Sequence, residues 1–188
     1  MRLAVFAIAA GVMAAGASGA AGVKSRVDFD KAFEFRQAHT FGWSATAGRI
    51  VVARTPDDDP EAIRRIAEPI IMNAVSAEMP RRGLNAATGS PDLTLTYYLL
   101  LTLGSSAQTL GQFLPPVTDW ALPPFAPATT SIKAIRRGSL VLDLSSDGRV
   151  VWRGVAEAEI KMDLSQEKRV ALMQEAVREI LTRYPPKK

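Results

Sequence analysis

The sequence predicts an α+β domain in which two helices pack on one face of a mainly antiparallel β-sheet. Two observations carry this prediction. Residues 139–159 alternate apolar and polar side chains on both sides of an Asp147-Gly148 dipeptide, the strongest short-range signal of a β-hairpin. Residues 59–79 and 163–181 repeat apolar side chains at the spacing of an amphipathic helix. The expected order is two strands, a helix, a strand, a long loop, the hairpin and a last helix.

Length and composition are those of one globular domain with a hydrophobic core. The chain has 188 residues, of which 47% are apolar and 22% charged, and it shows no internal repeat. The formal net charge is +4. Arginine pairs at 64–65, 81–82 and 136–137 either favour acidic surfaces such as lipid head groups or form a solvated face. Nucleic acid is not an expected partner, because no recognition motif is present.

Residues 1–20 have the pattern of a signal peptide. A positive start at Arg2 precedes an apolar run, residues 3–15, and small residues follow. A buried N-terminal helix is the alternative. The apolar run is too short to span a bilayer comfortably. We therefore expect residues 21–188 to form a single periplasmic domain. The chain has no cysteine, so neither a lipid anchor nor a disulfide is expected.

The first two expected strands carry candidate polar site residues. Residues 27–30, Val-Asp-Phe-Asp, alternate and direct Asp28 and Asp30 outward. Two carboxylates on one face are either half of a metal site or plain solvent-facing groups, and no third ligand lies nearby in the sequence. Residues 38–43 form the second strand, whose aromatic side chains face a core. This strand holds His39, the only histidine in the chain. We expect no metal site and no cofactor.

Residues 59–79 carry the start and stop signals of a helix. Asp59 is suited to cap its start, and Pro60 suits the first helical position. An apolar stripe of Ile63, Ile66, Ile70, Ala74 and Val75 follows, and Pro80 ends the helix. Because Pro69 removes one backbone hydrogen bond, we expect a kink there or two short helices.

A central strand and a long loop come next. Residues 91–101 begin with strict alternation and continue as an apolar run, as in a strand that enters the middle of a sheet. Residues 102–130 show neither helical nor strand periodicity, and they contain two Pro-Pro pairs and the aromatic residues Phe113, Trp120 and Phe125. Loops of this length are usually functional or disordered, and the aromatic residues argue against plain disorder.

The register of the hairpin decides which side chains are buried. A three-residue loop at 146–148 with a left-handed Gly148 places one apolar set on a single face: Leu140, Leu142, Leu144, Val150, Trp152 and Ala156. A two-residue loop would instead set Leu142 opposite Arg153, so the longer loop is favoured. Asp143 and Arg153 then form a diagonal pair on the wetter face, which contributes about 0.2–1 kcal/mol.

The last helix, residues 163–181, is capped by Asp163 or Ser165. Its apolar stripe consists of Val170, Met173, Val177, Ile180 and Leu181, and Pro185-Pro186 follows its end.

In order and spacing, these segments resemble a bacterial family called domain of unknown function 4136. The matching segments are residues 27–30, 39–43, 82–84, 90–93, 138–144, 151–154 and 184–186. The resemblance implies an exported or lipid-anchored envelope protein without an assigned role. This chain differs from that pattern in lacking the lipidated cysteine and in its longer, more apolar Pro-rich segment. The resemblance brings no catalytic residues.

No recognised catalytic motif is present in the sequence. A cysteine nucleophile is impossible, a G-x-S-x-G elbow is absent, and Gly104 and Gly111 lack the ending of a phosphate-binding loop. Glu157 and Glu159 share one strand face, as expected of a solvated edge. We therefore expect a non-enzymatic periplasmic binding or scaffolding module. Its partner would be an envelope protein or a lipid-like ligand that contacts Phe113, Trp120 and Phe125.

The alternative is a hydrolase of cell-wall polysaccharide that uses carboxylates. It requires Asp28, Asp30 or Asp92 to approach one another in a cleft.

Overall fold

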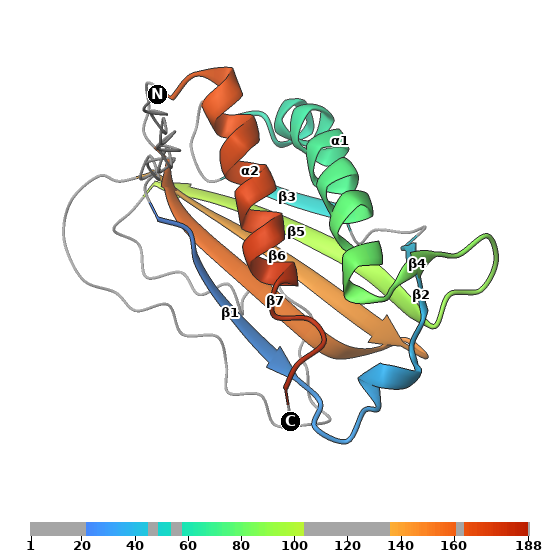
Figure 1. The fold of residues 1–188 in the computed structure, drawn as a ribbon. Coiled ribbons are helices and arrows are strands. Elements are labelled where there is room, and N and C mark those ends of the chain that lie inside the picture. The colour runs from blue at the N-terminus through green and yellow to red at the C-terminus, as the bar shows by residue number, and fades with distance from the viewer. Residues whose placement is uncertain (1–21, 45–48, 54–57, 104–135, 161–163, 188) are drawn as a thin grey trace, which may run out of the picture.

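The computed structural model describes residues 22–44, 49–53, 58–103, 136–160 and 164–187. In this part of the chain, two helices cover one face of a seven-stranded, mostly antiparallel sheet, which confirms the predicted α+β class (Figure 1). The strands are β1 (Lys24–Phe29), β2 (Thr40–Trp43), β3 (Arg49–Ala53), β4 (Asn85–Ala86), β5 (Leu93–Leu103), β6 (Arg136–Ser146) and β7 (Arg149–Ile160). The helices are α1 (Pro60–Glu78) and α2 (Gln166–Leu181), with short 3₁₀ turns at Phe35–Gln37 and Pro80–Arg82.

The sheet has the order β1-β7-β6-β5-β2-β4, and β3 also pairs with β5. The pairs β1–β7, β7–β6 and β6–β5 are antiparallel, whereas β2 and β3 lie parallel to successive parts of β5. The sequence pattern did not predict β3. Parallel neighbours require a long crossover connection, and α1 supplies the one between β3 and β5. Helix α1 therefore crosses the sheet because β3 pairs in parallel with β5. The hydrophobic periodicity of the sequence alone does not predict that pairing.

The hairpin of β6 and β7 confirms the predicted buried face and corrects the predicted loop. The loop has two residues, not three: Asp147 (φ 51°) and Gly148 (φ 76°) are both left-handed, and Ser146 pairs with Arg149. A register shift between Leu144 and Ser145 adds one residue to β7. This β-bulge restores the apolar face despite the short loop.

With the bulge, Leu144 faces Trp152, Leu142 faces Gly154, and Leu140 faces Ala156. The predicted place of Val150 in this set is wrong: the fully buried Val151 joins the core beside Trp152.

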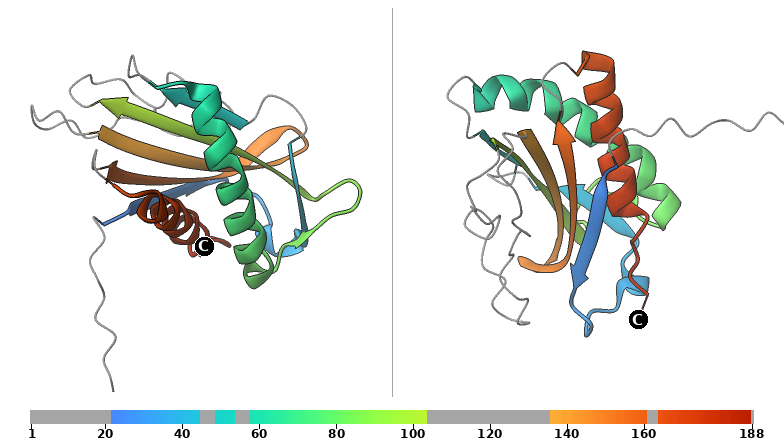
Figure 2. Two further views of the ribbon diagram at one scale, coloured as in Figure 1. Left: turned by 90° about the horizontal axis from the view of Figure 1, so that it is seen from above. Right: turned by 90° about the vertical axis from the view of Figure 1, so that its left-hand side faces the viewer.

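Both helices begin where the sequence predicts. The carboxylate of Asp59 accepts a hydrogen bond from the amide of Glu61 at 2.9 Å, and Ser165 accepts one from the amide of Lys168 at 3.4 Å. α1 continues through Pro69 as one helix, and its axis bends along its length (Figure 2). A proline inside a helix accounts for such a bend.

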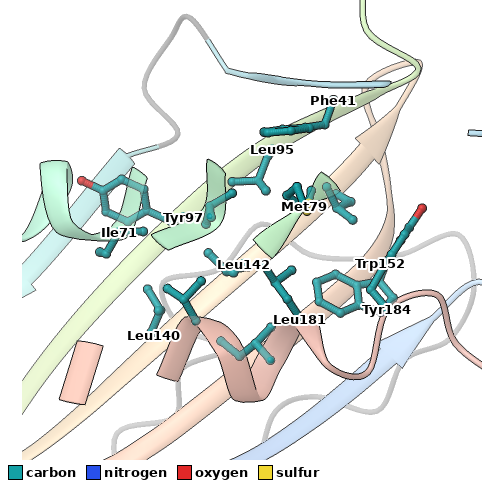
Figure 3. Packing of buried hydrophobic residues seen from close by; sticks show 14 of the residues in the cluster. Phe41, Ile71, Met79, Leu95, Tyr97, Leu140, Leu142, Trp152, Leu181 and Tyr184 are labelled. Atoms are coloured by element: carbon teal, nitrogen blue, oxygen red, sulfur yellow. The ribbon is translucent and has the colours of Figure 1, made fainter. Parts of the chain in front are cut away.

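The main core lies between the sheet and the two helices. Figure 3 shows Leu140 and Leu142 of β6 facing Leu181 of α2, with Ile71 of α1 next to Tyr97 of β5. Trp152 is completely buried in this core, as predicted, and contacts Tyr184 edge to face at 5.7 Å between ring centroids. A second, smaller cluster of Leu100, Val141 and Val155 lies apart from it. Neither described helix is long and apolar enough to cross a membrane.

Candidate functional site

An apolar groove of about 460 Å³ lies between the N-terminal parts of α1 and α2 and the sheet beneath them. Each wall comes from a different element. The lining consists of Ile63, Ile66, Ala67 and Ile70 of α1, Leu99 and Leu101 of β5, Ile160 of β7, and Leu164, Val170, Leu172 and Met173 in and before α2, with Asp58, Gln166 and Arg169 as its polar members. A hollow of this size with a mostly apolar lining and a few polar groups has the properties of a small-molecule site.

The apolar stripe of α1 is divided between the core and this groove. Val75 and Ile71 are fully buried, whereas Ile63 and Ile70 are half-buried and Ile66 is 56% exposed. The prediction that Ile66 faces the core is therefore wrong. Because α1 bends, its N-terminal half does not lie flat on the sheet, and its isoleucines line a hollow.

A second, smaller hollow of about 50 Å³ lies beneath α2. Leu99, Ile160, Leu172 and Met173 line both spaces. On the sheet side, the smaller hollow is lined by Gly138, Ala156 and Ala158 together with Leu140. A Cβ atom at Gly138 would lie 2.7 Å from Cδ1 of Ile160, so the end of the Ile160 side chain lies directly over this glycine.

The polar lining residues lie at the starts of the two helices. Asp58 comes just before the cap of α1, and Gln166 is the first residue of α2. The Nε of Arg169 donates a hydrogen bond to the carbonyl oxygen of Leu164 at 3.0 Å, which orients its guanidinium group. Both helices begin at the same end of the sheet (Figure 1). The groove is therefore polar at one end and apolar at the other.

A buried ion pair occupies the sheet between β6 and β7. Asp143 and Arg153 lie directly opposite each other and form two hydrogen bonds of 2.7 Å, with Asp143 1% and Arg153 6% exposed. The prediction of a diagonal pair on a wet surface is wrong: the two-residue loop and the bulge together place Asp143 directly opposite Arg153, and both side chains are buried. Burial raises the pKa of Asp143, and the Arg153 guanidinium offsets part of that rise.

This pair is the centre of a polar row across four strands. Asp28 of β1 lies opposite Arg153, and Thr96 of β5 lies opposite Asp143. A carboxylate that accepts two hydrogen bonds from a buried guanidinium is a poor nucleophile or base, because removing it from that pair leaves a buried charge. The row therefore favours a structural role over a catalytic one.

The other carboxylates singled out in the sequence bind separate partners. Asp30 is buried, not outward as predicted, and it accepts hydrogen bonds from the amide of Ala32 and from Arg149, each at 2.8 Å. Asp92 lies at the start of β5, and β7, β6 and β5 separate its partner strand β2 from β1. The structure therefore does not bring Asp92 to Asp28 or Asp30.

Asp92 joins β2 to the start of β5. Its carboxylate accepts hydrogen bonds from the amides of His39 and Thr40 at 2.9 Å and from the Thr40 hydroxyl at 2.8 Å. These bonds, first the His39 amide and then the Thr40 hydroxyl, lower the pKa of Asp92. His39 itself is exposed. In the described part of the chain, no three histidine or acidic side chains are grouped to hold a metal ion.

The other site predictions have mixed outcomes. Phe113, Trp120 and Phe125, the residues proposed for partner binding, lie outside the described residues, as does most of the 102–130 loop. Glu157 is half-buried and Glu159 exposed on β7. Sequence reasoning missed the groove entirely. The α1 stripe gave no signal of it, because three isoleucines within eight positions are what a helix packed on one sheet face ordinarily carries.

Comparisons with known proteins identify a family and a shared fold. A family model described as "Domain of unknown function (DUF4136)" matches residues 25–186. No curated protein matches the chain.

Three solved structures are similar. A PDZ domain protein from Parabacteroides distasonis has 15% sequence identity and a TM-score of 0.52, and the match covers 89% of this chain and 36% of that one. This chain thus spans about a third of that protein, and the likeness shows the fold alone. Two PelC dodecamer structures from Paraburkholderia phytofirmans have TM-scores of 0.43 and 0.38, too low to support an argument. Their identities are 10% and 11%, and the matches cover 89% and 86% of this chain and 100% and 95% of theirs.

Proposed function

Because this chain belongs to the family called domain of unknown function 4136, which assigns it no activity, we propose a function from its geometry. The protein is an exported, non-enzymatic binding module of the cell envelope, and it holds an apolar ligand in the groove between α1 and α2. The observation that carries this proposal is the groove of about 460 Å³ with its mostly apolar lining.

Two further features support the proposal. The N-terminal pattern of residues 1–20 favours export, and a periplasmic protein meets lipids and their fragments. Ile66 is 56% exposed on the groove wall, and a bound apolar ligand would remove its side chain from water. Under the same proposal, Phe113, Trp120 and Phe125 provide a second contact, with an envelope protein or with the ligand itself.

The competing proposal is a carboxylate-dependent hydrolase of cell-wall polysaccharide. Such enzymes place two carboxyl groups on either side of the bond they cleave. Among the described residues that line the groove, Asp58 is the one carboxylate, and Asp92 is remote from Asp28 and Asp30. The binding module is therefore the better-supported function. Release of soluble sugar from purified cell wall by the wild-type protein, abolished in Asp28→Asn or Asp92→Asn, would reverse this preference.

The binding function is tested by titrating the purified protein with an apolar dye that fluoresces when it leaves water, such as N-phenylnaphthylamine. The wild-type protein is expected to bind one dye molecule. Val170→Trp should weaken binding at least ten-fold because it occupies the space of the ligand, and Ile66→Gln should weaken it about three- to ten-fold because it removes apolar contact area.

The matched control is Ile50→Gln. Ile50 is also a large exposed apolar residue, 39% exposed, but it lies on β3 and does not line the groove. Its substitution should leave dye binding unchanged. The proposal is wrong if the wild type does not bind the dye, or if Ile50→Gln and Val170→Trp weaken binding equally.

A further inference from the structure

We infer that the sheet face opposite the helices is an internal docking surface, and that one segment of the same chain, residues 104–135 between β5 and β6, packs on it. We call this surface the far face. Its apolar centre consists of Leu100, Val141 and Val155, with Val52 and Tyr98 around them. The inference goes beyond the proposed function, because the groove lies on the helix side of the sheet.

The far face is buried although neither described helix packs on it. Val141 is 0%, Val155 1% and Leu100 6% exposed. These three residues form a cluster apart from the main core, and no residue of α1 or α2 belongs to it. Both helices lie on the other side of the sheet (Figure 2). A valine in the middle of an open sheet face keeps part of its side chain in water, so further atoms of this chain must lie over the far face.

The ion pair of Asp143 and Arg153 leads to the same conclusion. Alternate residues of a strand share a face, so Asp143 lies on the same side as Val141, and Arg153 on the same side as Val155. On an open face water would reach the Asp143 carboxylate, yet this residue is 1% exposed. Burial decreases toward β3, where Ile50 is 39% exposed. The covering layer is therefore centred on β5, β6 and β7.

The segment between Leu103 and Arg136 has the length and the end points to form this layer. The other internal ranges outside the described residues are 45–48, 54–57 and 161–163, each too short to cross a sheet. Leu103 pairs with Arg136, so the segment leaves and re-enters the sheet at one place on β5 and β6. Extended, half of its length reaches on the order of 50 Å. The distance from β5 to β7 is two strand spacings, about 10 Å.

The composition of residues 104–135 suits an apolar surface. Asp119 and Lys133 are the charged residues of the segment. A segment this poor in charge and rich in apolar side chains lacks the composition of disordered chains. Antiparallel neighbours can be joined by two residues, so the connection of β5 to β6 does not require this length. Phe113, Trp120 and Phe125 belong to the segment, and a partner that contacts them would meet part of the folded domain.

Photocrosslinking from the described side tests which segment lies over the far face. The photoreactive residue p-benzoylphenylalanine replaces Tyr98, which is half-buried there, in the otherwise complete protein purified after export. Irradiation should join this position to a peptide within residues 104–135, in a product that migrates as a monomer. The matched control is the same replacement at Arg178, which is exposed on α2 and should give no such crosslink. The inference is overturned if position 98 crosslinks to a second copy, to another protein, to residues 1–21 or to nothing.

Adjacent residues of β6 test the contact by stability. Val141 belongs to the far face and Leu142 to the main core. Val141→Ala and Leu142→Ala should each lower the melting temperature by about 3–15 °C. Both are then repeated in a variant that carries a Gly-Ser sequence of equal length at residues 108–131, so that the loop-closure entropy is kept. There Val141→Ala should lose about a third or less of its former amount, whereas Leu142→Ala should keep its full loss.

An equal loss for Val141→Ala in both backgrounds overturns the inference. If the Gly-Ser variant does not melt cooperatively, the crosslink from position 98 decides, because it is made with residues 104–135 intact. Dye binding in the groove reports on the helix side of the sheet. A protein that fails the dye titration and still gives the crosslink therefore refutes the proposed function alone, and the reverse result refutes this inference alone.

Discussion

At the scale of single residues, the sheet buries two charged side chains that bind each other. Asp143 and Arg153 are charged, yet both are buried and satisfy each other with two hydrogen bonds. The contributions of the two residues to the free energy of folding are coupled, because removal of one side chain leaves the other charge unpaired in a low-dielectric interior. The pair also specifies register, since a slip of β7 by one residue would carry Arg153 to the helix side of the sheet and leave Asp143 on the other side.

Arg153→Met should lower the free energy of unfolding by about 3–5 kcal/mol, because it leaves the Asp143 carboxylate buried without its partner. The double variant Asp143→Leu/Arg153→Met should lose much less, since it removes both charges. Urea denaturation measures each value. Glu61→Gln, which breaks an exposed pair with Arg64, is the control and should cost less than about 1 kcal/mol. Equal losses for the single and double variants would argue against coupling.

At the scale of elements, α2 packs closely on the sheet because Gly154 has no side chain. Gly154 lies opposite Leu142 in the middle of β7, on the face that carries Trp152. A Cβ atom there would lie 2.6 Å from the Trp152 ring and would also clash with Ile180 of α2. The absence of a side chain therefore allows the indole to lie along the strand while the helix packs over it.

Gly154→Ala should destabilise the fold by about 1–3 kcal/mol, because the tryptophan and Ile180 must both move to admit one methyl group. Thermal unfolding gives the change, and near-ultraviolet circular dichroism reports whether the Trp152 environment is altered. Gly89→Ala is the matched control, since a Cβ atom at that glycine would meet nothing within 4 Å. A Gly154→Ala protein as stable as the control would show that the core adjusts freely.

At the scale of the whole molecule, the fold is a sheet of unequal strands under one helical layer. The central strands β5, β6 and β7 are 11, 11 and 12 residues long, whereas β4 has two residues at one edge. The core packs on the long strands, and the groove opens where the two helices begin. Stability should therefore be concentrated at the centre of the sheet, with the groove end less constrained.

Amide hydrogen exchange should follow this distribution. Amides of β6, which is paired on both sides, should exchange only with global unfolding, and those of β4 should exchange orders of magnitude faster. Mass spectrometry of peptides covering each strand measures both rates. Binding of a ligand in the groove should slow exchange in the first turns of α1 and α2 while leaving β4 unchanged. Uniform exchange across the sheet would contradict this picture.

The sequence by itself determined the elements whose signals are local: the place of the hairpin, the caps of both helices, the inward face with Trp152 and the α+β class. Each depends on side chains a few residues apart, so periodicity and turn chemistry suffice. Only the tertiary structure decided the bulge that buries Asp143 with Arg153, the parallel strand β3 and the groove. These depend on segments distant in the chain: the bend of α1, the start of α2 and the small residues of β6 and β7 create the hollow together. No local sequence pattern predicts the angle between α1 and α2, because that angle depends on how both helices pack against the same sheet.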